Sequence, residues 1–220
     1  MTTELIRDIS ASFGVECPDV LTGFKYIAEQ IANTPDKQFI VGGEESYGYL
    51  VGDFVRDKDA VSACCMIAEM AAVLADSGKT LYRQLQELYL QYGFYKESLL
   101  SITRKGQAGA AEIQQMMDNF RSNPPREING SKVMKMMDYK NRVSTDLSDG
   151  ATTPITLPKS DVLQFFTADG TKITVRPSGT EPKIKFYFGV KEELSDLQSF
   201  ERTSQELDTK IEKVKASLKL

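Results

Sequence analysis

Apolar residues recur every three or four positions in two short segments, 4–13 and 24–32, which predicts two amphipathic helices. Residues 37–43, KQFIVGG, form a short apolar run that ends in glycines, as a buried strand does. Residues 59–75 are apolar on nearly all sides, which predicts a buried helix. Residues 80–92 begin with a threonine suited to cap a helix and continue as an apolar stripe. Helices that alternate with a strand indicate an α/β domain.

The second half of the chain begins with a helical stretch over 108–121 and then changes character. Residues 132–139 predict a strand, and the polar, turn-rich residues 141–160 predict a long loop. Beyond them, the apolar segments VLQFF (162–166) and TKITV (171–175) flank TADG, whose Asp-Gly pair is typical of a hairpin turn.

The last part of the chain predicts one more strand and a long helix. KIKFYFGV (183–190) alternates again, and a long amphipathic segment follows it to the C-terminus. Strands followed by a covering helix predict an α+β domain. We therefore expect two domains, residues 1–100 and 101–220, with a boundary within KESLLSITRKGQ (96–107).

Composition narrows the choice of partners. The chain has 220 residues, a net charge of −4 and a pI near 5.1, which argues against a general binder of nucleic acid or membrane surfaces. An anionic ligand must then meet a local cluster of Lys and Arg. The three cysteines, including adjacent Cys64 and Cys65, have no metal-ligand spacing and predict reduced core residues of a cytoplasmic protein. We find no apolar stretch of about 18 residues and no signal-peptide pattern.

One basic segment, RPSGTEPK, begins at Arg176 between two predicted strands. The guanidinium of Arg176 matches the oxygens of a phosphate, and Gly179 permits a backbone conformation that lets N–H groups point into one concavity. Ser178 and Thr180 add hydroxyl donors, and Lys185 raises the local positive potential. These residues suit a phosphate site. They equally suit a tight hairpin turn in which a glutamate neutralises the nearby bases.

A second segment, GGEESYGYLVGDFVRDKDA (42–60), is flexible, acidic and rich in glycine, and it lies between the apolar strand and the apolar helix. It resembles the sugar-binding loop of the α-D-phosphohexomutases, the phosphoglucomutase/phosphomannomutase family. RPSGTEPKIKFYF resembles the phosphate-binding loop of their C-terminal domain, and LTGFK (21–25) resembles a loop of their third domain. The order and spacing of the motifs agree with that family.

The resemblance implies a fold and an activity. It implies a Rossmann-like α/β third domain with a mixed sheet, followed by an α+β fourth domain whose antiparallel sheet is covered by helices, similar to the TATA-box-binding protein. Members of the family move a phosphoryl group between C1 and C6 of a hexose through a bisphosphate. They use Mg²⁺, with hexose 1,6-bisphosphate as activator and intermediate.

The resemblance also implies site residues. Glu44 and Ser46 would bind ring hydroxyls, because a carboxylate accepts hydrogen bonds from two neighbouring OH groups and a hydroxyl can donate or accept. The full sugar-binding set would be Thr22, Gly23, Gly43, Glu44, Ser46 and Lys58. The phosphate-binding set would be Arg176, Ser178, Gly179, Thr180 and Lys185.

Two family motifs are absent. The catalytic serine of the family lies beside a histidine, and a D-x-D-x-D-R loop holds Mg²⁺, but the chain has no histidine and only RDKDA resembles the metal loop. We therefore expect no catalytic and no metal-binding residues here. The chain would be the C-terminal half of such an enzyme, without the first strand of domain 3 and inactive without domains 1 and 2 as partners.

Two other interpretations stay open at this stage. The chain could be a stand-alone regulatory module that binds phosphate or sugar phosphate, or an interaction protein in which both loops are ordinary turns. The preference between glucose, mannose and pentose phosphates is also open, although GEES resembles the glucose-preferring branch.

Overall fold

The computed structural model describes residues 2–179 and 181–220. They form two compact units, residues 2–92 and 93–220. The strand β3 (Phe94–Thr103) belongs to the second unit, where it pairs along its whole length with β10. A boundary at 100/101 would fall inside this strand.

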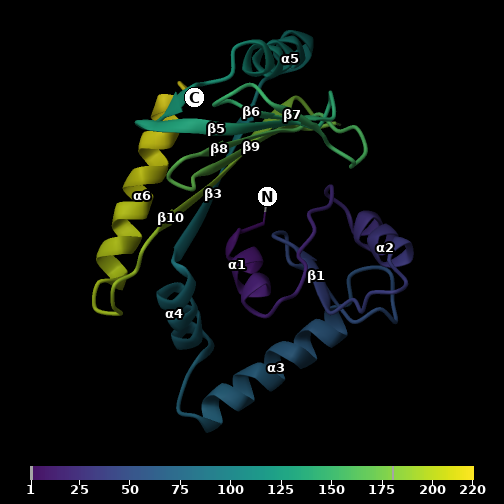
Figure 1. The fold of residues 1–220 in the computed structure, drawn as a ribbon, viewed down its shortest axis with the longest axis vertical. Coiled ribbons are helices and arrows are strands. Elements are labelled where there is room, and N and C mark those ends of the chain that lie inside the picture. Colours follow the sequence, from purple (N-terminus) through teal and green to yellow (C-terminus); the bar gives the residue numbers. More distant parts are fainter. Residues whose placement is uncertain (1, 180) are drawn as a thin grey trace. The chain divides into compact units, whose positions relative to one another are not determined.

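The first unit contains four helices and one hairpin (Figure 1). The positions of its helices agree with the apolar pattern of the sequence. Thr80 caps α4, because the backbone N–H of Arg83 donates to Thr80 Oγ1 at 3.1 Å. The elements are α1 (Leu5–Ser12), α2 (Phe24–Asn33), β1 (Val41–Glu44), β2 (Gly48–Val51), α3 (Ala60–Asp76) and α4 (Leu81–Tyr92).

Three expectations for this unit are wrong. The only sheet among its described residues is the antiparallel pair of β1 and β2, not a mixed Rossmann-like sheet. Strand β1 is largely exposed, and α3 buries only Ala63, so Cys64 and Cys65 lie at the surface. The reason is size: a hairpin of two four-residue strands cannot cover a 17-residue helix. The core is correspondingly small and consists of Phe24, Ile27, Ile31 and Leu50.

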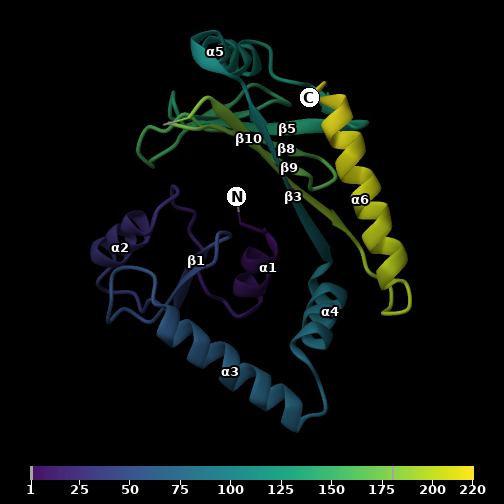
Figure 2. The same cartoon turned by 180° about the vertical axis from the view of Figure 1, so that it is seen from behind.

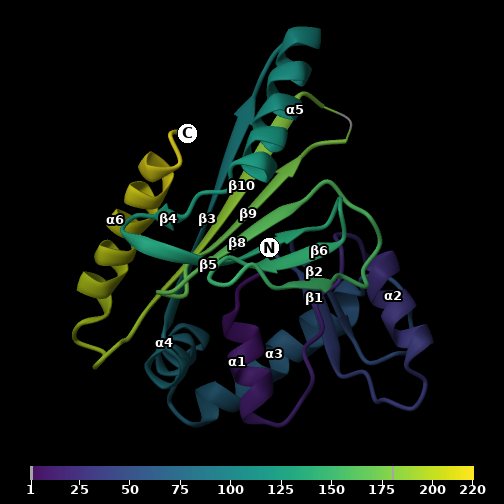
Figure 3. The same ribbon diagram turned by 45° about the horizontal axis from the view of Figure 1, so that its top comes forward.

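The second unit is an antiparallel sheet with two helices, as expected (Figure 3). Its strand order is β3-β10-β9-β8-β5-β6-β7, and β4 pairs with β5. Besides β3, the elements are α5 (Gly106–Ser122), β4 (Glu127–Ile128), β5 (Ser131–Asp138), β6 (Val143–Asp146), β7 (Thr152–Pro154), β8 (Leu163–Thr167), β9 (Lys172–Pro177), β10 (Lys183–Glu192) and α6 (Phe200–Ser217).

Residues 141–160 are not one long loop, because they contain β6 and β7. These two strands lie at one edge of the sheet, and their residues are half-buried or exposed. A strand that buries neither face needs no apolar alternation, so the sequence gives no sign of it.

Both long helices pack on the same face of the sheet. Ile113 and Met117 of α5 and Val214 of α6 share one core with strand residues such as Phe186 and Phe188. In Figures 1 and 2, α6 is the yellow helix that runs beside β3 and β10. Because side chains alternate along a strand, the residues between these core positions lie on the opposite face.

Among the described residues, no single helix is long and apolar enough to cross a membrane. Only α3 and α4 taken together, with a bend of 86° between them, reach that length and composition.

Candidate functional site

The acidic glycine-rich segment forms the tip of the β1–β2 hairpin. Glu44 pairs with Gly48 across the hairpin, and three residues, 45–47, connect them. Tyr47 has a φ of 65°, the left-handed conformation that often closes a three-residue hairpin loop. Ser46 is exposed at the tip, where its hydroxyl can reach a ligand.

The start of α2 binds the carboxylate of this hairpin. The backbone N–H of Gly23, the N-cap residue of α2, donates to Glu44 Oε1 at 2.6 Å. An anion is favourable there because the first N–H groups of a helix carry a partial positive charge. One bond leaves most of the acceptor capacity of the carboxylate for a ligand. LTGFK and GEESYG, separate in the sequence, therefore lie together in the fold.

Lys58 lies beside the same hairpin. Its ammonium group donates to Asp57 Oδ1 at 2.9 Å, and this hydrogen bond lowers the pKa of the Asp57 carboxyl. The same nitrogen lies 5.1 Å from the ring centroid of Phe24, the first residue of α2. The structure thus brings Gly23, Glu44 and Lys58 of the expected sugar-binding set together.

Packing explains two glycines of the hairpin. A Cβ on Gly43 would lie 2.9 Å from Cδ1 of Tyr49, and a Cβ on Gly48 would lie 2.7 Å from Cε2 of Phe24. Both distances are shorter than real carbon contacts. Close approach of a ligand is therefore not the only reason for glycine at these positions.

The basic segment occupies the turn between β9 and β10. Arg176 and Lys185 are directly opposite each other on these strands, on the face away from the core. The N–H of Ser178 donates to Lys183 O at 2.8 Å, and the N–H of Glu181 donates to Ser178 Oγ at 3.3 Å. The structure thus places the guanidinium group of Arg176, the ammonium group of Lys185 and the hydroxyl group of Ser178 at one end of the sheet.

Two details of this turn differ from the expectation or fall outside it. Gly179 is exposed and does not have a left-handed φ, so the conformational reason given for glycine does not hold. Thr180 lies outside the described residues. Ser178 and Gly179 remain candidates through their position in the turn.

Glu181 modifies the charge of the turn. Its carboxylate accepts from Lys183 Nζ at 2.8 Å, and this bond, with the charges of Lys183 and Lys185, lowers the pKa of Glu181. The turn therefore neutralises one of its bases, as the interpretation as a tight hairpin predicts. The adjacent cations of Arg176 and Lys185 are what favour an anion site.

Strand β3 brings further groups to this site that the sequence did not reveal. Ser101 lies opposite Lys185, and Thr103 lies opposite Lys183. The N–H of Arg104 donates to Pro182 O at 2.9 Å, which ties the end of β3 to the turn. The sequence of residues 96–107 favours a domain boundary, although the polar Ser101 and Thr103 on either side of Ile102 are typical of a strand.

Within residues 2–179 and 181–220, no group of three or more His, Cys, Asp or Glu side chains could hold a metal ion. The resemblance implies that the Mg²⁺ ligands belong to a D-x-D-x-D-R loop, which this sequence does not contain. No step proposed below therefore passes through a metal.

Comparison with known proteins supports the resemblance of both halves of the chain to one family. Residues 1–92 match the family model "Phosphoglucomutase/phosphomannomutase, alpha/beta/alpha domain III", and residues 105–204 match the model of the C-terminal domain of the same family. The chain belongs to the phosphoglucomutase/phosphomannomutase family.

Relatives of this phosphoglucomutase/phosphomannomutase chain include a phosphoglucomutase of Staphylococcus aureus (strain MSSA476), 40% identical over 212 residues, or 96% of this chain and 37% of the relative. A phosphoglucomutase of Staphylococcus epidermidis (strain ATCC 12228) is 41% identical over 184 residues, or 83% of this chain and 34% of the relative. The chain therefore spans little more than a third of the length of these relatives.

A solved structure shares the fold. The open form of pp63/parafusin, a phosphoglucomutase from Paramecium, matches 97% of this chain and 37% of its own chain with a TM-score of 0.59 and 17% identity. At that identity the match supports the fold alone.

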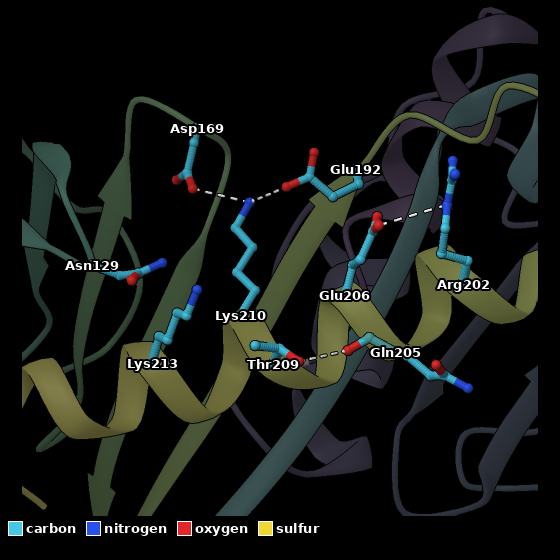
Figure 4. A pocket seen from close by; sticks show the side chains of 9 residues that line it. All are labelled: Asn129, Asp169, Glu192, Arg202, Gln205, Glu206, Thr209, Lys210 and Lys213. Carbon is cyan, nitrogen blue, oxygen red and sulfur yellow. Dashed lines mark hydrogen bonds and ion pairs between the residues drawn. The ribbon is translucent and has the colours of Figure 1, made fainter. Parts of the chain in front are cut away.

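A groove of about 530 Å³ lies in the C-terminal domain of this family member, away from the basic turn. Figure 4 shows the side chains that line it. The groove is next to Asp169 and Glu192, at the other ends of β9 and β10. Lys210 of α6 donates to Glu192 Oε1 at 2.8 Å and forms an ion pair with Asp169 Oδ2 at 3.0 Å. We call these three residues the α6 clasp. They hold α6 to the sheet.

Burial acts to raise the pKa of the Asp169 carboxyl, but hydrogen bonds from Thr167 and Lys210 outweigh burial and hold that pKa below its ordinary value. Burial acts to lower the pKa of the Lys210 ammonium group, but Glu192 and Asp169 raise it above its ordinary value. The clasp thus stabilises the charged form of these two side chains.

Proposed function

We propose that this chain is the substrate-recognition part of a cytoplasmic phosphoglucomutase/phosphomannomutase and that it binds a hexose phosphate. The GEESYG hairpin binds the ring hydroxyls, and the RPSGT turn binds a phosphate. The hydrogen bond from Gly23 to Glu44 is the observation that carries the proposal, because it joins two motifs of the proposed sugar site.

The chemistry of each loop suits its proposed ligand. The Glu44 carboxylate can accept hydrogen bonds from two neighbouring ring hydroxyls, and the Ser46 hydroxyl can donate or accept. Arg176 and Lys185, opposite each other on β9 and β10, supply charge-assisted hydrogen bonds to the phosphate. Binding energy from the phosphate that does not react can position the reacting end of the sugar.

Phosphoryl transfer is assigned to the remainder of such an enzyme. Its domains 1 and 2 would supply the catalytic serine and the Mg²⁺ ligands that the resemblance implies. Hexose 1,6-bisphosphate would be the intermediate that turns over between the two transfers. Glucose 1-phosphate is the proposed substrate, since the relatives compared above are named phosphoglucomutases.

Amide chemical-shift mapping of the chain tests the division between the loops. Inorganic phosphate is expected to shift signals near residues 176–185 alone. Glucose 1-phosphate is expected to shift these signals and also those of residues 43–48 and Lys58. A stand-alone phosphate-binding module would instead respond to the two ligands at the same residues, which would contradict the sugar assignment.

Three variants sharpen this experiment. Glu44→Gln keeps an oxygen for the Gly23 N–H, so it should erase the sugar-dependent shifts and leave the phosphate response intact.

Arg176→Ala should weaken phosphate binding about tenfold to a hundredfold, the range expected for charge-assisted hydrogen bonds. The matched control is Arg56→Ala, an exposed arginine outside both sets, which should change little. Equal losses from the two arginine variants would show that general charge, not the turn, binds the ligand.

A further inference from the structure

The ring of Phe24 lies where the start of α2, the sugar-binding hairpin and Lys58 meet. Phe24 is 5% exposed and belongs to the core of residues 2–92. A Cβ on Gly48 would come within 2.7 Å of the Phe24 ring and within 3.3 Å of Cδ of Lys58. The glycine in the hairpin therefore leaves room for the ring and for the lysine stem.

Phe24 also attracts the charged end of Lys58. The ammonium nitrogen is 5.1 Å from the ring centroid, within the range of a cation–π interaction. The Lys58 side chain is more than half exposed, and Asp57, its ion-pair partner, is more exposed still. An ion pair between two exposed side chains holds a flexible lysine weakly. The ring of Phe24 is buried in the core and is therefore held more firmly than either exposed side chain.

We propose that Phe24 is a positioning residue, which holds Lys58 against the GEESYG hairpin so that its ammonium group can reach an anionic sugar ligand. Gly48 belongs to the same arrangement, because the side chain of any larger residue at this position would displace the Phe24 ring. This inference rests on the proposed function, since it gives Lys58 a ligand only if the hairpin is the sugar-binding part of a hexose phosphate site. Phe24 of LTGFK would then position Lys58 in addition to packing in the core.

The first readout needs no ligand. In the NMR spectrum, the ε-methylene protons of Lys58 should be shifted upfield by the Phe24 ring. Phe24→Leu keeps an apolar side chain and should abolish this shift, whereas Phe24→Tyr keeps the ring and should preserve it. An unchanged Lys58 signal in Phe24→Leu would overturn the proposal.

The second readout is affinity for glucose 1-phosphate in a double-mutant cycle. Phe24→Leu should weaken binding about two- to fivefold, as the loss of one exposed cation–π contact predicts, and Phe24→Tyr should restore it. In a Lys58→Met background the same substitution should cause no further loss. Equal fold losses in the two backgrounds would show that Phe24 acts by packing alone, and would overturn the proposal.

A matched control is available on the same helix. Lys25 Nζ lies 4.8 Å from the ring centroid of Tyr26, and this pair is outside both proposed binding sets. Tyr26→Leu should therefore leave the affinity unchanged. If Phe24→Leu disturbs the fold of the hairpin, Gly48→Ala takes its place in the cycle, because it moves the ring without removing it.

Failure of the proposed function can be told apart from failure of this inference. If the unmodified chain shows no response to glucose 1-phosphate, the proposed function fails and the role of Phe24 in binding fails with it. The upfield shift of Lys58 then still decides whether the ring fixes the lysine. If the chain binds and the cycle shows no coupling, only the inference fails.

Discussion

At the scale of single residues, two different physical reasons favour glycine at Gly23 and at Gly43 and Gly48 of the β1–β2 hairpin. Gly23 has φ 122° and ψ 131°, a backbone conformation that side chains other than hydrogen disfavour. Gly43 and Gly48 lack the space for a Cβ, as described above. A substitution therefore acts on the backbone at Gly23 and on side-chain packing at the other two.

Gly23→Ala should destabilise residues 2–92 by about 1–3 kcal/mol, the cost of holding a non-glycine residue in a sparsely populated conformation. It should also weaken the hydrogen bond to Glu44, because relaxation of the strain turns the N–H away. Urea unfolding followed through amide signals of α2 and β2 measures the change. The control is Gly179→Ala, since Gly179 has an open surrounding and no left-handed φ. A neutral Gly23→Ala would contradict the role given to this conformation.

The candidate residues of the site could be proposed only in part from the sequence. Glu44, Arg176 and Lys185 could be proposed because they belong to long motifs. The contact of Phe24 with Gly48 and Lys58 could not, because it depends on how a helix and a hairpin far apart in the chain pack together. The spacing of residues in a sequence indicates periodicity along one helix or strand, but it does not indicate which two elements pack against each other.

At the scale of elements, a helix or strand could be predicted where one of its faces is buried, because burial leaves a pattern of apolar residues. The pairing of β8 with β9 around Asp169-Gly170 was predicted correctly, since its apolar alternation and its turn residues agree. Strands β6 and β7 were missed because they bury neither face. The burial of α3 was predicted wrongly, because an apolar composition indicates a need for burial and does not supply the element that covers the helix.

The α6 clasp gives a prediction at this scale. Lys210→Met should lower the free energy of unfolding of residues 93–220 by about 1–2 kcal/mol at pH 7, because it leaves Asp169 and Glu192 without their common cation. Lys213→Met is the matched control, because Lys213 lines the same groove and has no ion pair within the part of the chain that the structure describes. Urea unfolding followed through signals of β8 to β10 measures the change.

The effect of Lys210→Met should depend on pH in a defined direction. The pKa of Asp169 is lower in the folded protein than its ordinary value of about 3.9. Its pairing therefore contributes stability fully above that ordinary value and loses it as the pH falls toward the folded pKa. The difference between Lys210→Met and the unmodified chain should be constant from about pH 5 to 8 and shrink below about pH 4. A constant difference down to pH 2 would show that the lysine stem, not the charge, stabilises α6.

At the scale of the whole molecule, the two units differ in how well they bury their apolar residues. Among the described residues, all exposed large hydrophobic side chains but one lie in residues 2–92, and the exception is Leu99. The second unit surrounds a large core that includes three phenylalanines of its sheet. The recognition of sugar is thus proposed for a unit with a small core, and that of phosphate for a unit with a large one.

The chain alone should not interconvert hexose phosphates. With glucose 1-phosphate, Mg²⁺ and a catalytic amount of glucose 1,6-bisphosphate, we expect no hexose 6-phosphate above the uncatalysed level. The chain has no histidine to lie beside a phosphorylated serine, and its described residues contain no group of side chains that could hold the metal. Binding that holds a substrate without stabilising the transition state does not accelerate the chemical step.

The same sample should still show the glucose 1-phosphate shifts near residues 43–48 and 176–185, which separates an inactive chain from an unfolded one. Turnover by the purified 220-residue chain, lost on Arg176→Ala, would contradict the assignment of catalysis to other domains.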